Sequence, residues 1–346
     1  MRAMRMHAIS DLQRQAEPLV AERIPLPELA TGELLVEVHA CGVCRTEIDE
    51  IEGRTPPPVL PMTPGHQAVG TVIAEHPGCR LGLHGQRVGV AWIHSSCGKC
   101  AWCRQGLENL CPRFRATGRD APGGYAEFLA IHEDFAHPLP PSLESTAAAP
   151  LLCAGAVGLR ALRSCQLGAG EALGLTGFGA SGHLVLQMAR FLHPDSALCV
   201  FARDPTERSF ALELGADWAG DIRDPAPQPL AAVIDTTPAW TPVVAALAQL
   251  APGGRLVINA IRKQDRDQAA LLELRYEEHL WREKSIRSVA NVTRADVRDC
   301  LELAARIPLT PEVACYALED ANRALCELTA GALRGAKVLV TARPQD

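Results

Sequence analysis

Four cysteines lie within one stretch of fifteen residues, and this stretch constrains the fold more than any other feature of the chain. The spacing is C-x2-C-x2-C-x7-C, and its members are Cys97, Cys100, Cys103 and Cys111. Four thiolates in a short loop can fill all positions around a tetrahedral Zn²⁺ ion, which predicts a structural rather than a catalytic site. An iron–sulfur cluster is one alternative, because three closely spaced cysteines also suit it; free thiols in a loop or a redox pair are the others. An open metal site has to be sought elsewhere in the chain.

The composition is that of an ordinary globular protein. The chain has 346 residues, of which 47% are hydrophobic and 21% are charged, and this length favours two domains. A net charge of −6 argues against a nucleic-acid partner, since such binders carry a basic excess. The sequence has thirteen cysteines but shows neither a secretory signal pattern nor an apolar run of membrane-spanning length. This combination predicts a cytoplasmic, non-membrane protein whose thiols are metal-bound or buried.

The pattern of apolar residues changes near Thr146. The earlier part is β-rich, as in Glu33–Ala40, where apolar and polar residues alternate. The later part alternates strands with helices, as in the strand Ala172–Thr176 and the helix Ala180–Leu192. This order predicts βαβ units and a parallel sheet. We therefore expect an α/β protein that combines a β-rich domain with a doubly wound parallel-sheet domain.

A glycine-rich turn of the form G-x-G-x-x-G joins that strand to that helix. Its residues are Gly177, Phe178, Gly179, Ala180, Ser181 and Gly182. The first glycine allows a tight turn, the second lets the backbone approach a pyrophosphate, and the third lets helix and strand pack closely. The N–H groups at the helix N-terminus then face the phosphates. The motif predicts NAD or NADP binding, and the alternative is an ordinary strand–helix turn.

The end of the next strand bears on the choice between the two dinucleotides. A carboxylate about twenty residues after the glycines bonds the adenosine ribose and rejects a 2′-phosphate. Ala202 stands where that carboxylate is expected, and Arg203 follows it. Because arginine pairs well with phosphate, these residues favour NADP. Two alternatives stay open: Arg203 only stacks on the adenine, or Asp204 takes the carboxylate role.

Cys44, His66 and Cys153 are further candidate metal ligands, although they lie far apart in the sequence. Two thiolates and one imidazole would leave the fourth position of a tetrahedral zinc open for water or substrate. Spacing alone does not join them, because a single cysteine is more often a small buried apolar residue.

At these residues the chain resembles the zinc-dependent alcohol dehydrogenases of the medium-chain dehydrogenase/reductase superfamily, over essentially its whole length. The matching segments are CGVCRT at 41–46, PGHQAVG at 64–70, LLCAG at 151–155, the four-cysteine stretch, APGGRLV at 251–257 and GAKVLV at 335–340. The resemblance implies a GroES-like catalytic domain of residues 1–154 and 291–346, with a structural zinc lobe at about 94–112. It implies a Rossmann domain at 155–290, and a homodimer or homotetramer.

The resemblance also implies roles for residues. Cys44, His66 and Cys153 would hold a catalytic zinc, so that each chain would carry two zinc ions. Thr46 would hydrogen-bond the bound alcohol and pass its proton onward. Arg45 would approach the cofactor pyrophosphate.

Four other positions complete this expectation. Trp92 would line the substrate pocket, or else only pack in the core. Gln67 replaces a glutamate that moves onto the metal in some relatives, and it lacks the charge. Asp49, a candidate catalytic residue, replaces a relay-ending histidine, and an ordinary aspartate does not titrate near neutral pH. The proton relay would then end at the cofactor ribose and water. Glu47 would orient His66.

The implied function is NAD(P)-dependent oxidation of small to medium alcohols to aldehydes or ketones, and the reverse reduction, by hydride transfer. One alternative is a zinc-independent quinone or enoyl reductase on the same fold. Another is a catalytically inactive relative kept for binding. The intact candidate ligands and glycine motif argue against both. The sequence does not name the substrate.

Overall fold

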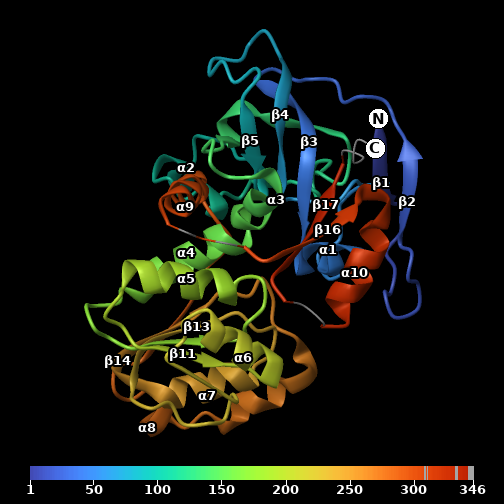
Figure 1. Ribbon diagram of the computed structural model, residues 1–346. Coiled ribbons are helices and arrows are strands. Elements are labelled where there is room, and N and C mark those ends of the chain that lie inside the picture. The colour runs from blue at the N-terminus through green and yellow to red at the C-terminus, as the bar shows by residue number, and fades with distance from the viewer. Residues whose placement is uncertain (308, 310, 332–333, 342–346) are drawn as a thin grey trace. The chain divides into compact units, whose positions relative to one another are not determined.

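The computed structural model describes residues 1–307, 309, 311–331 and 334–341, and these form two compact units (Figure 1). The first unit contains Met1–Ala156 together with the chain from Val292 onward. The second unit contains Val157–Asn291. The first unit is therefore built from both parts of the chain that flank the second.

The first unit is organised around a seven-stranded sheet in the order β16-β17-β3-β4-β5-β9, with β8 pairing on β3. The strands are β3 (Glu33–Val43), β4 (Ala68–Glu75), β5 (Arg87–Val90), β8 (Phe128–His132), β9 (Ala136–Pro138), β16 (Val313–Ala317) and β17 (Ala336–Val340). The long strand β3 is antiparallel to β4, β8 and β17, and so joins the two ends of the chain. Two further pairs are β1 (Arg2–Met6) with β2 (Leu19–Arg23), and β6 (Ile93–Ser95) with β7 (Arg115–Ala116).

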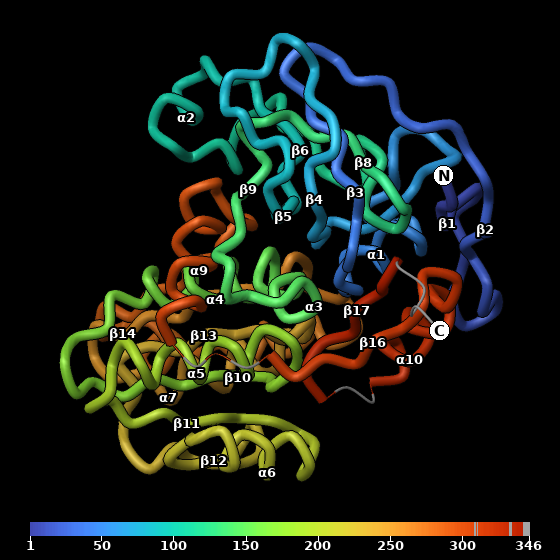
Figure 2. The backbone as a smooth tube through the Cα atoms, turned by 45° about the horizontal axis from the view of Figure 1, so that its top comes forward, coloured from blue at the N-terminus to red at the C-terminus, as the bar shows by residue number. Residues whose placement is uncertain are grey.

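Short helices connect and flank these strands, as the tube in Figure 2 shows. They are α1 (Arg45–Ile51), α2 (Ala101–Arg104), α3 (Ser145–Ala148), α9 (Arg294–Arg306) and α10 (Ala321–Thr329), with the 3-10 turns η1 (Glu108–Leu110), η2 (Glu133–Phe135), η3 (Ala149–Leu152) and η5 (Leu318–Asp320). The helix α9 starts with a capping box. The Thr293 hydroxyl accepts the Asp296 N–H at 3.2 Å, and the Asp296 carboxylate accepts the Thr293 N–H at 2.9 Å.

The second unit is a six-stranded parallel sheet in the order β12-β11-β10-β13-β14-β15. Its strands are β10 (Leu173–Thr176), β11 (Leu198–Phe201), β12 (Trp218–Gly220), β13 (Leu230–Asp235), β14 (Leu250–Ile258) and β15 (Ser285–Ser288). Its helices are α5 (Gly182–Leu192), α6 (Pro205–Glu213), α7 (Thr241–Gln249) and α8 (Tyr276–His279), with η4 (Asp265–Glu273), and α4 (Ala154–Cys165) leads into it. Figure 1 shows α5 and α7 on opposite faces of the sheet, which explains why β10 and β11 are buried throughout.

The strand order reverses between β10 and β13, and ligands bind at such switch points in open α/β sheets. The expected class, a β-rich part with a doubly wound parallel sheet, is confirmed. The elements that were not predicted include α4 and β15. The helix α4 contains Gly155 and Gly158, which are poor helix formers, and β15 is exposed at all four residues and so carries no apolar alternation.

No single helix in the described ranges is long and apolar enough to cross a membrane. The bent pair Ser145–Leu152 and Ala154–Cys165 passes the same criterion of length and composition only when taken together.

Candidate metal and cofactor sites

Three candidate ligands that are distant in sequence come together in the first unit. Cys44 follows β3, His66 lies just before β4, and Cys153 follows η3. Their ligand atoms all lie within 4.8 Å of one another. His66 and Cys153 are buried and Cys44 is partly buried. The fold therefore assembles the group that sequence spacing could not join, which we call the triad.

The imidazole of His66 is oriented by Glu47. The Nδ1 atom of His66 lies 2.5 Å from Glu47 Oε1, whereas Nε2 is buried and has no hydrogen-bond partner within the described part of the chain. A buried ring nitrogen that has no hydrogen-bond partner and lies beside two thiols is free to bind a metal ion. Two cysteines and one histidine with an open position fit a catalytic zinc.

The charges of the triad are unequal. A hydrogen bond with Cys153, aided by His66, holds the pKa of the Cys44 thiol well below its ordinary value. The same bond, together with burial, raises the pKa of Cys153. Burial alone would lower the pKa of His66, but the negative charges of Glu47 and Cys44 raise it. Cys44 is thus the member that ionises most readily.

The helix α1 begins at Cys44 and fixes the neighbouring groups. The Glu47 carboxylate accepts the Cys44 backbone N–H at 2.8 Å, so that one side chain holds both the ligand loop and His66. Thr46 is buried, and its Oγ1 lies 3.7 Å from Cys44 Sγ. Arg45 is exposed on the same turn. The structure therefore places the expected proton acceptor directly beside a candidate ligand.

Two positions that depart from the family pattern have defined surroundings. The Asp49 carboxylate accepts a hydrogen bond from the Arg54 guanidinium and is thus part of an ion pair. Gln67 is buried against β3, where its backbone carbonyl accepts the Gly42 N–H at 3.0 Å. A Cβ at Gly42 would lie 2.9 Å from the Gln67 side chain, so glycine makes room for it.

Trp92 is only partly buried, and two side chains cover its ring. The ring centroid lies 4.9 Å from that of Phe114, and the Arg119 guanidinium carbon lies 5.7 Å from it. Its indole Nε1 is buried without a hydrogen-bond partner in the described structure. Trp92 thus packs against Phe114 and Arg119 and also has an indole donor without a partner among the described residues.

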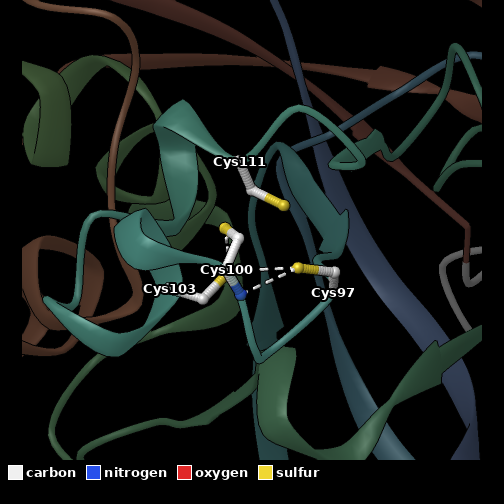
Figure 3. Close-up of side chains that lie close together, drawn as sticks. All are labelled: Cys97, Cys100, Cys103 and Cys111. Atoms are coloured by element: carbon white, nitrogen blue, oxygen red, sulfur yellow. Dashed lines mark hydrogen bonds between the residues drawn. The ribbon is translucent and has the colours of Figure 1, made fainter.

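The four cysteines of the tetrad converge, as Figure 3 shows, with their sulfurs all within 4.8 Å of one another. Cys103 Sγ lies 3.5 Å from Cys100 Sγ and 3.9 Å from Cys97 Sγ. The Cys100 N–H donates to Cys97 Sγ at 3.3 Å. Backbone donors, first that of Lys99, lower the pKa of Cys97 to about 5, whereas burial raises that of Cys111 to about 11. Four sulfurs without a further donor fit a closed zinc site.

The lobe that carries the tetrad is tied to α9 by Glu108. This residue lies on η1, between two of the cysteines, and is 1% exposed. Its Oε1 accepts the Arg294 backbone N–H at 2.8 Å and the Arg294 Nε–H at 3.0 Å. A carboxylate is favourable at a helix N-terminus, so this contact holds the lobe on the first unit.

The glycine turn has the geometry that a pyrophosphate site needs. Gly177 has a φ of +81°, which favours glycine. A Cβ at Gly179 would meet nothing within 4 Å, so its backbone is open to a ligand, whereas a Cβ at Gly182 would lie 2.6 Å from the Gly177 carbonyl oxygen. Ala180 and Ser181 precede α5, which starts at Gly182 rather than at Ala180. These residues fit the phosphates of a dinucleotide.

The end of β11 bears on the ribose end of that site. Ala202 is buried and offers no carboxylate, and Arg203 is exposed. Asp204 caps α6, because its Oδ1 accepts the Thr206 N–H at 2.8 Å, and bonds from Thr206 lower its pKa. The Asp204 carboxylate is thus already used in a helix cap.

Two buried acids near these sites were missed by sequence reasoning. Glu50 on α1 is 2% exposed, and neither of its carboxylate oxygens has a hydrogen-bond partner among the described residues. Asp235 ends β13, is fully buried, and accepts bonds from Lys263 and from the Thr176 hydroxyl, the latter at 2.6 Å. For Asp235 the available signal was an acid directly after the apolar run at 230–234.

The chain is similar to known proteins over nearly its whole length. Residues 30–141 match the family described as "Alcohol dehydrogenase GroES-like domain". The protein named "Probable alcohol dehydrogenase AdhA" from Mycobacterium tuberculosis (strain CDC 1551 / Oshkosh) is 43% identical over 328 residues, which cover 93% of this chain and 92% of that protein. An alcohol dehydrogenase from Geobacillus stearothermophilus is 31% identical over 349 residues, covering 97% and 98%. The solved structure of a cobalt- and zinc-bound thermostable alcohol dehydrogenase from Pyrobaculum aerophilum has a TM-score of 0.86 at 22% identity, covering 99% of both chains.

Proposed function

Because the chain belongs to the alcohol dehydrogenase family of the medium-chain dehydrogenase/reductase superfamily, we propose that it is a zinc-dependent alcohol dehydrogenase. It interconverts small to medium alcohols and the matching aldehydes or ketones with NAD(P). One observation carries the proposal: Cys44, His66 and Cys153 converge, and the buried His66 Nε2 has no partner in the described structure.

The side chains around the triad have distinct tasks in this proposal. A zinc ion held by the triad would act as a Lewis acid and lower the pKa of a bound alcohol. Glu47 keeps His66 oriented with Nε2 free, and Thr46 Oγ1, beside Cys44, accepts the alcohol proton. Since Asp49 is paired with Arg54, the proton leaves through the cofactor ribose and water rather than through a histidine.

NADP is the proposed dinucleotide. Its nicotinamide carries the hydride, and Gly177, Gly179 and Gly182 shape the turn that receives the pyrophosphate. Arg45 is exposed on α1 and approaches the same phosphates in this proposal. Ala202 cannot repel a 2′-phosphate, the Asp204 carboxylate caps α6, and the exposed Arg203 is available to pair with it.

We also propose a structural zinc in the tetrad, giving two zinc ions per chain. Both sites require reduced thiols, which supports a cytoplasmic setting.

A homo-oligomer is proposed on the basis of the sheet edge in the second unit. The strand β15 ends that sheet, and all four of its residues are exposed, with Ile286 at 45%. Tyr276 and Trp281, which precede it, are 58% and 63% exposed. An exposed strand edge with apolar neighbours is a template for pairing with another chain, so a second copy is the proposed partner.

The test of this function is a screen of alcohols and aldehydes with NAD and with NADP, together with metal analysis. We expect turnover, two zinc ions per chain, and preference for NADP. Arg203→Ala should raise the KM for NADP more than that for NAD, and equal effects would reject the role of Arg203. Activity that survives a chelator would favour the zinc-independent reductase. A bound cofactor without turnover of any substrate would favour an inactive relative.

A further inference from the structure

Glu50 is a buried acid without a hydrogen-bond partner, and the proposed chemistry does not use it. The side chain is 2% exposed, and both Oε1 and Oε2 lack a partner among the residues that the structure describes. Its oxygens do not belong to the group of ligand atoms that gather within 4.8 Å at the triad. A buried carboxyl group is costly unless it is hydrogen-bonded. Glu50 can therefore accept a hydrogen bond from a bound molecule.

The carboxyl group lies beside the triad. Thr46 and Glu50 are four residues apart on α1 and thus share one face of the helix. This face of α1 is directed toward the triad at Thr46, because Thr46 Oγ1 lies 3.7 Å from Cys44 Sγ. Consistent with this position, burial and the charge of Glu47 raise the pKa of Glu50, while His66 and Arg119 oppose the rise. Glu50 is thus a neighbour of the site without being one of its ligands.

Two other buried polar atoms, one just after α1 and one beside Arg119, lack partners in the described structure. Thr55 Oγ1 is buried without one in the described part of the chain, and the Thr55 backbone N–H is bonded to the Asp49 carbonyl at 3.1 Å, at the end of α1. Trp92 Nε1 is likewise buried and unpartnered. The Arg119 guanidinium carbon lies 5.7 Å from the Trp92 ring centroid, and the Arg119 charge also opposes the rise in the pKa of Glu50.

To be satisfied, these atoms need hydrogen-bond donors as well as hydrogen-bond acceptors. Glu50 offers acceptor oxygens, the Trp92 indole offers only a donor, and the Thr55 hydroxyl can do either. An alkyl chain would satisfy none of them. An ammonium group could donate to Glu50 but could not accept from Trp92. A hydroxyl group can do both.

We propose that Glu50 is a specificity-determining residue that binds a second hydroxyl group of the substrate, so that the preferred substrates are diols or polyols rather than plain alkanols. The inference rests on the proposed alcohol dehydrogenase function and deepens it. Glu50 forms and breaks no covalent bond; it accepts a hydrogen bond from the substituent while the reacting carbon lies at the triad.

The test compares matched substrates in the wild-type protein and in Glu50 variants. The substrates are 1-butanol, 1,4-butanediol and 4-amino-1-butanol. The pair 1-propanol and 1,3-propanediol tests a shorter distance between the reacting carbon and the second hydroxyl group. We expect wild-type kcat/KM to be higher for a diol than for its alkanol by roughly tenfold to a hundredfold, as for a site with buried groups that need a hydrogen bond. Glu50→Leu should abolish this preference, and Glu50→Gln should keep part of it.

Controls separate specificity from folding. Glu52→Gln changes an acid at the end of the same helix that is already paired with Arg54, and it should leave the preference intact. Circular dichroism and zinc content should match the wild type in every variant that is scored. Equal kcat/KM for diol and alkanol in the wild type, or equal loss for both in Glu50→Leu, would overturn the proposal. A preference for the amino alcohol over the diol would overturn the hydroxyl assignment.

A binding measurement keeps the proposal independent of turnover. With NADP present, 1,4-butanediol should raise the wild-type melting temperature more than 1-butanol does, and Glu50→Leu should lose that difference. If no alcohol is oxidised but this difference remains, the proposed function fails and the Glu50 site stands. If alcohols are oxidised and the difference in melting temperature is absent, the proposed function stands and the Glu50 site fails.

Discussion

The two cysteine sites of the first unit are assembled in opposite ways. The tetrad takes its four sulfurs from one lobe, at residues 97–111, whereas the triad takes its ligands from three segments that follow or precede β3, β4 and η3. The tetrad offers four sulfurs. The triad offers two sulfurs and the buried His66 Nε2, which has no hydrogen-bond partner among the described residues. A closed local site can stabilise a loop, while an open site built by the whole fold can bind a reactant.

Each site is also anchored by a buried glutamate, and the two glutamates have different tasks. Glu108 ties the tetrad lobe to the start of α9, away from the triad's own contacts. Glu47 instead ties His66 to the start of α1, next to Thr46. The first contact holds a lobe in place, and the second orients a ligand. Mutations should therefore separate stability from turnover.

The largest expected effect comes from breaking the triad. Cys153→Ala removes one of three ligands and should bring turnover below detection, because a zinc held by two protein ligands loses affinity and geometry. The tetrad zinc should remain, so metal analysis should fall from two ions to one with an unchanged circular dichroism spectrum. Cys165→Ala, at a buried cysteine in α4, is the matched control and should keep both ions. Substantial turnover in Cys153→Ala would contradict the assignment of the two sites.

The same comparison shows what could be predicted from sequence. The tetrad and the glycine turn are local, since their chemistry lies within a few consecutive residues, and the fold class follows from the alternation of strands and helices. The triad required the resemblance, because Cys44, His66 and Cys153 come from three segments that are distant in sequence and that only the fold brings together. Glu50 was missed because an acid on a short helix usually faces solvent. Likewise, the capping role of Asp204 depends on where α6 begins.

Opening the tetrad should reduce stability rather than chemistry. Cys103→Ala leaves three sulfurs in an exposed lobe, and its loss of metal should lower the melting temperature by on the order of 10 °C, if the structural zinc contributes about 3–5 kcal/mol. Turnover measured well below the transition should stay within a few-fold of the wild type. Cys315→Ala, at an exposed cysteine, provides the control. A Cys103→Ala protein that is fully stable but inactive would reverse the roles of the two sites.

A smaller effect is expected when the orientation of His66 is disturbed without removal of a ligand. Glu47→Gln keeps the size of the side chain but removes the carboxylate that lies 2.5 Å from His66 Nδ1. Loss of such a partner weakens metal affinity by roughly 10–100-fold, which competition with a chelator can measure at the triad alone. Glu47→Asp keeps the charge and should recover most of the affinity. Equal affinity in all three proteins would show that Glu47 does not support the metal.

The smallest expected effect concerns acid stability near the α9 contact. His137 on β9 is 8% exposed, and burial, aided by the charges of Arg294 and Arg298, lowers its pKa to about 4. The unfolded chain, with an ordinary histidine pKa of 6.5, takes up a proton that the folded chain refuses until about pH 4. The free energy of unfolding should therefore fall as the pH drops from 6.5 toward 4, and this histidine should account for about 2 kcal/mol between pH 7 and pH 5.

Urea unfolding of wild type and His137→Gln at several pH values measures this contribution. The difference in unfolding free energy between the two proteins should change with pH between 6.5 and 4 and level off above pH 7. His84→Gln, at an exposed position, should follow the wild type throughout. If the pH dependence of His137→Gln is the same as that of the wild type, the acid sensitivity arises elsewhere, and the groups buried around the triad become the place to look. That result would shift pH-sensitive stability from the neighbourhood of the lobe to the site of chemistry.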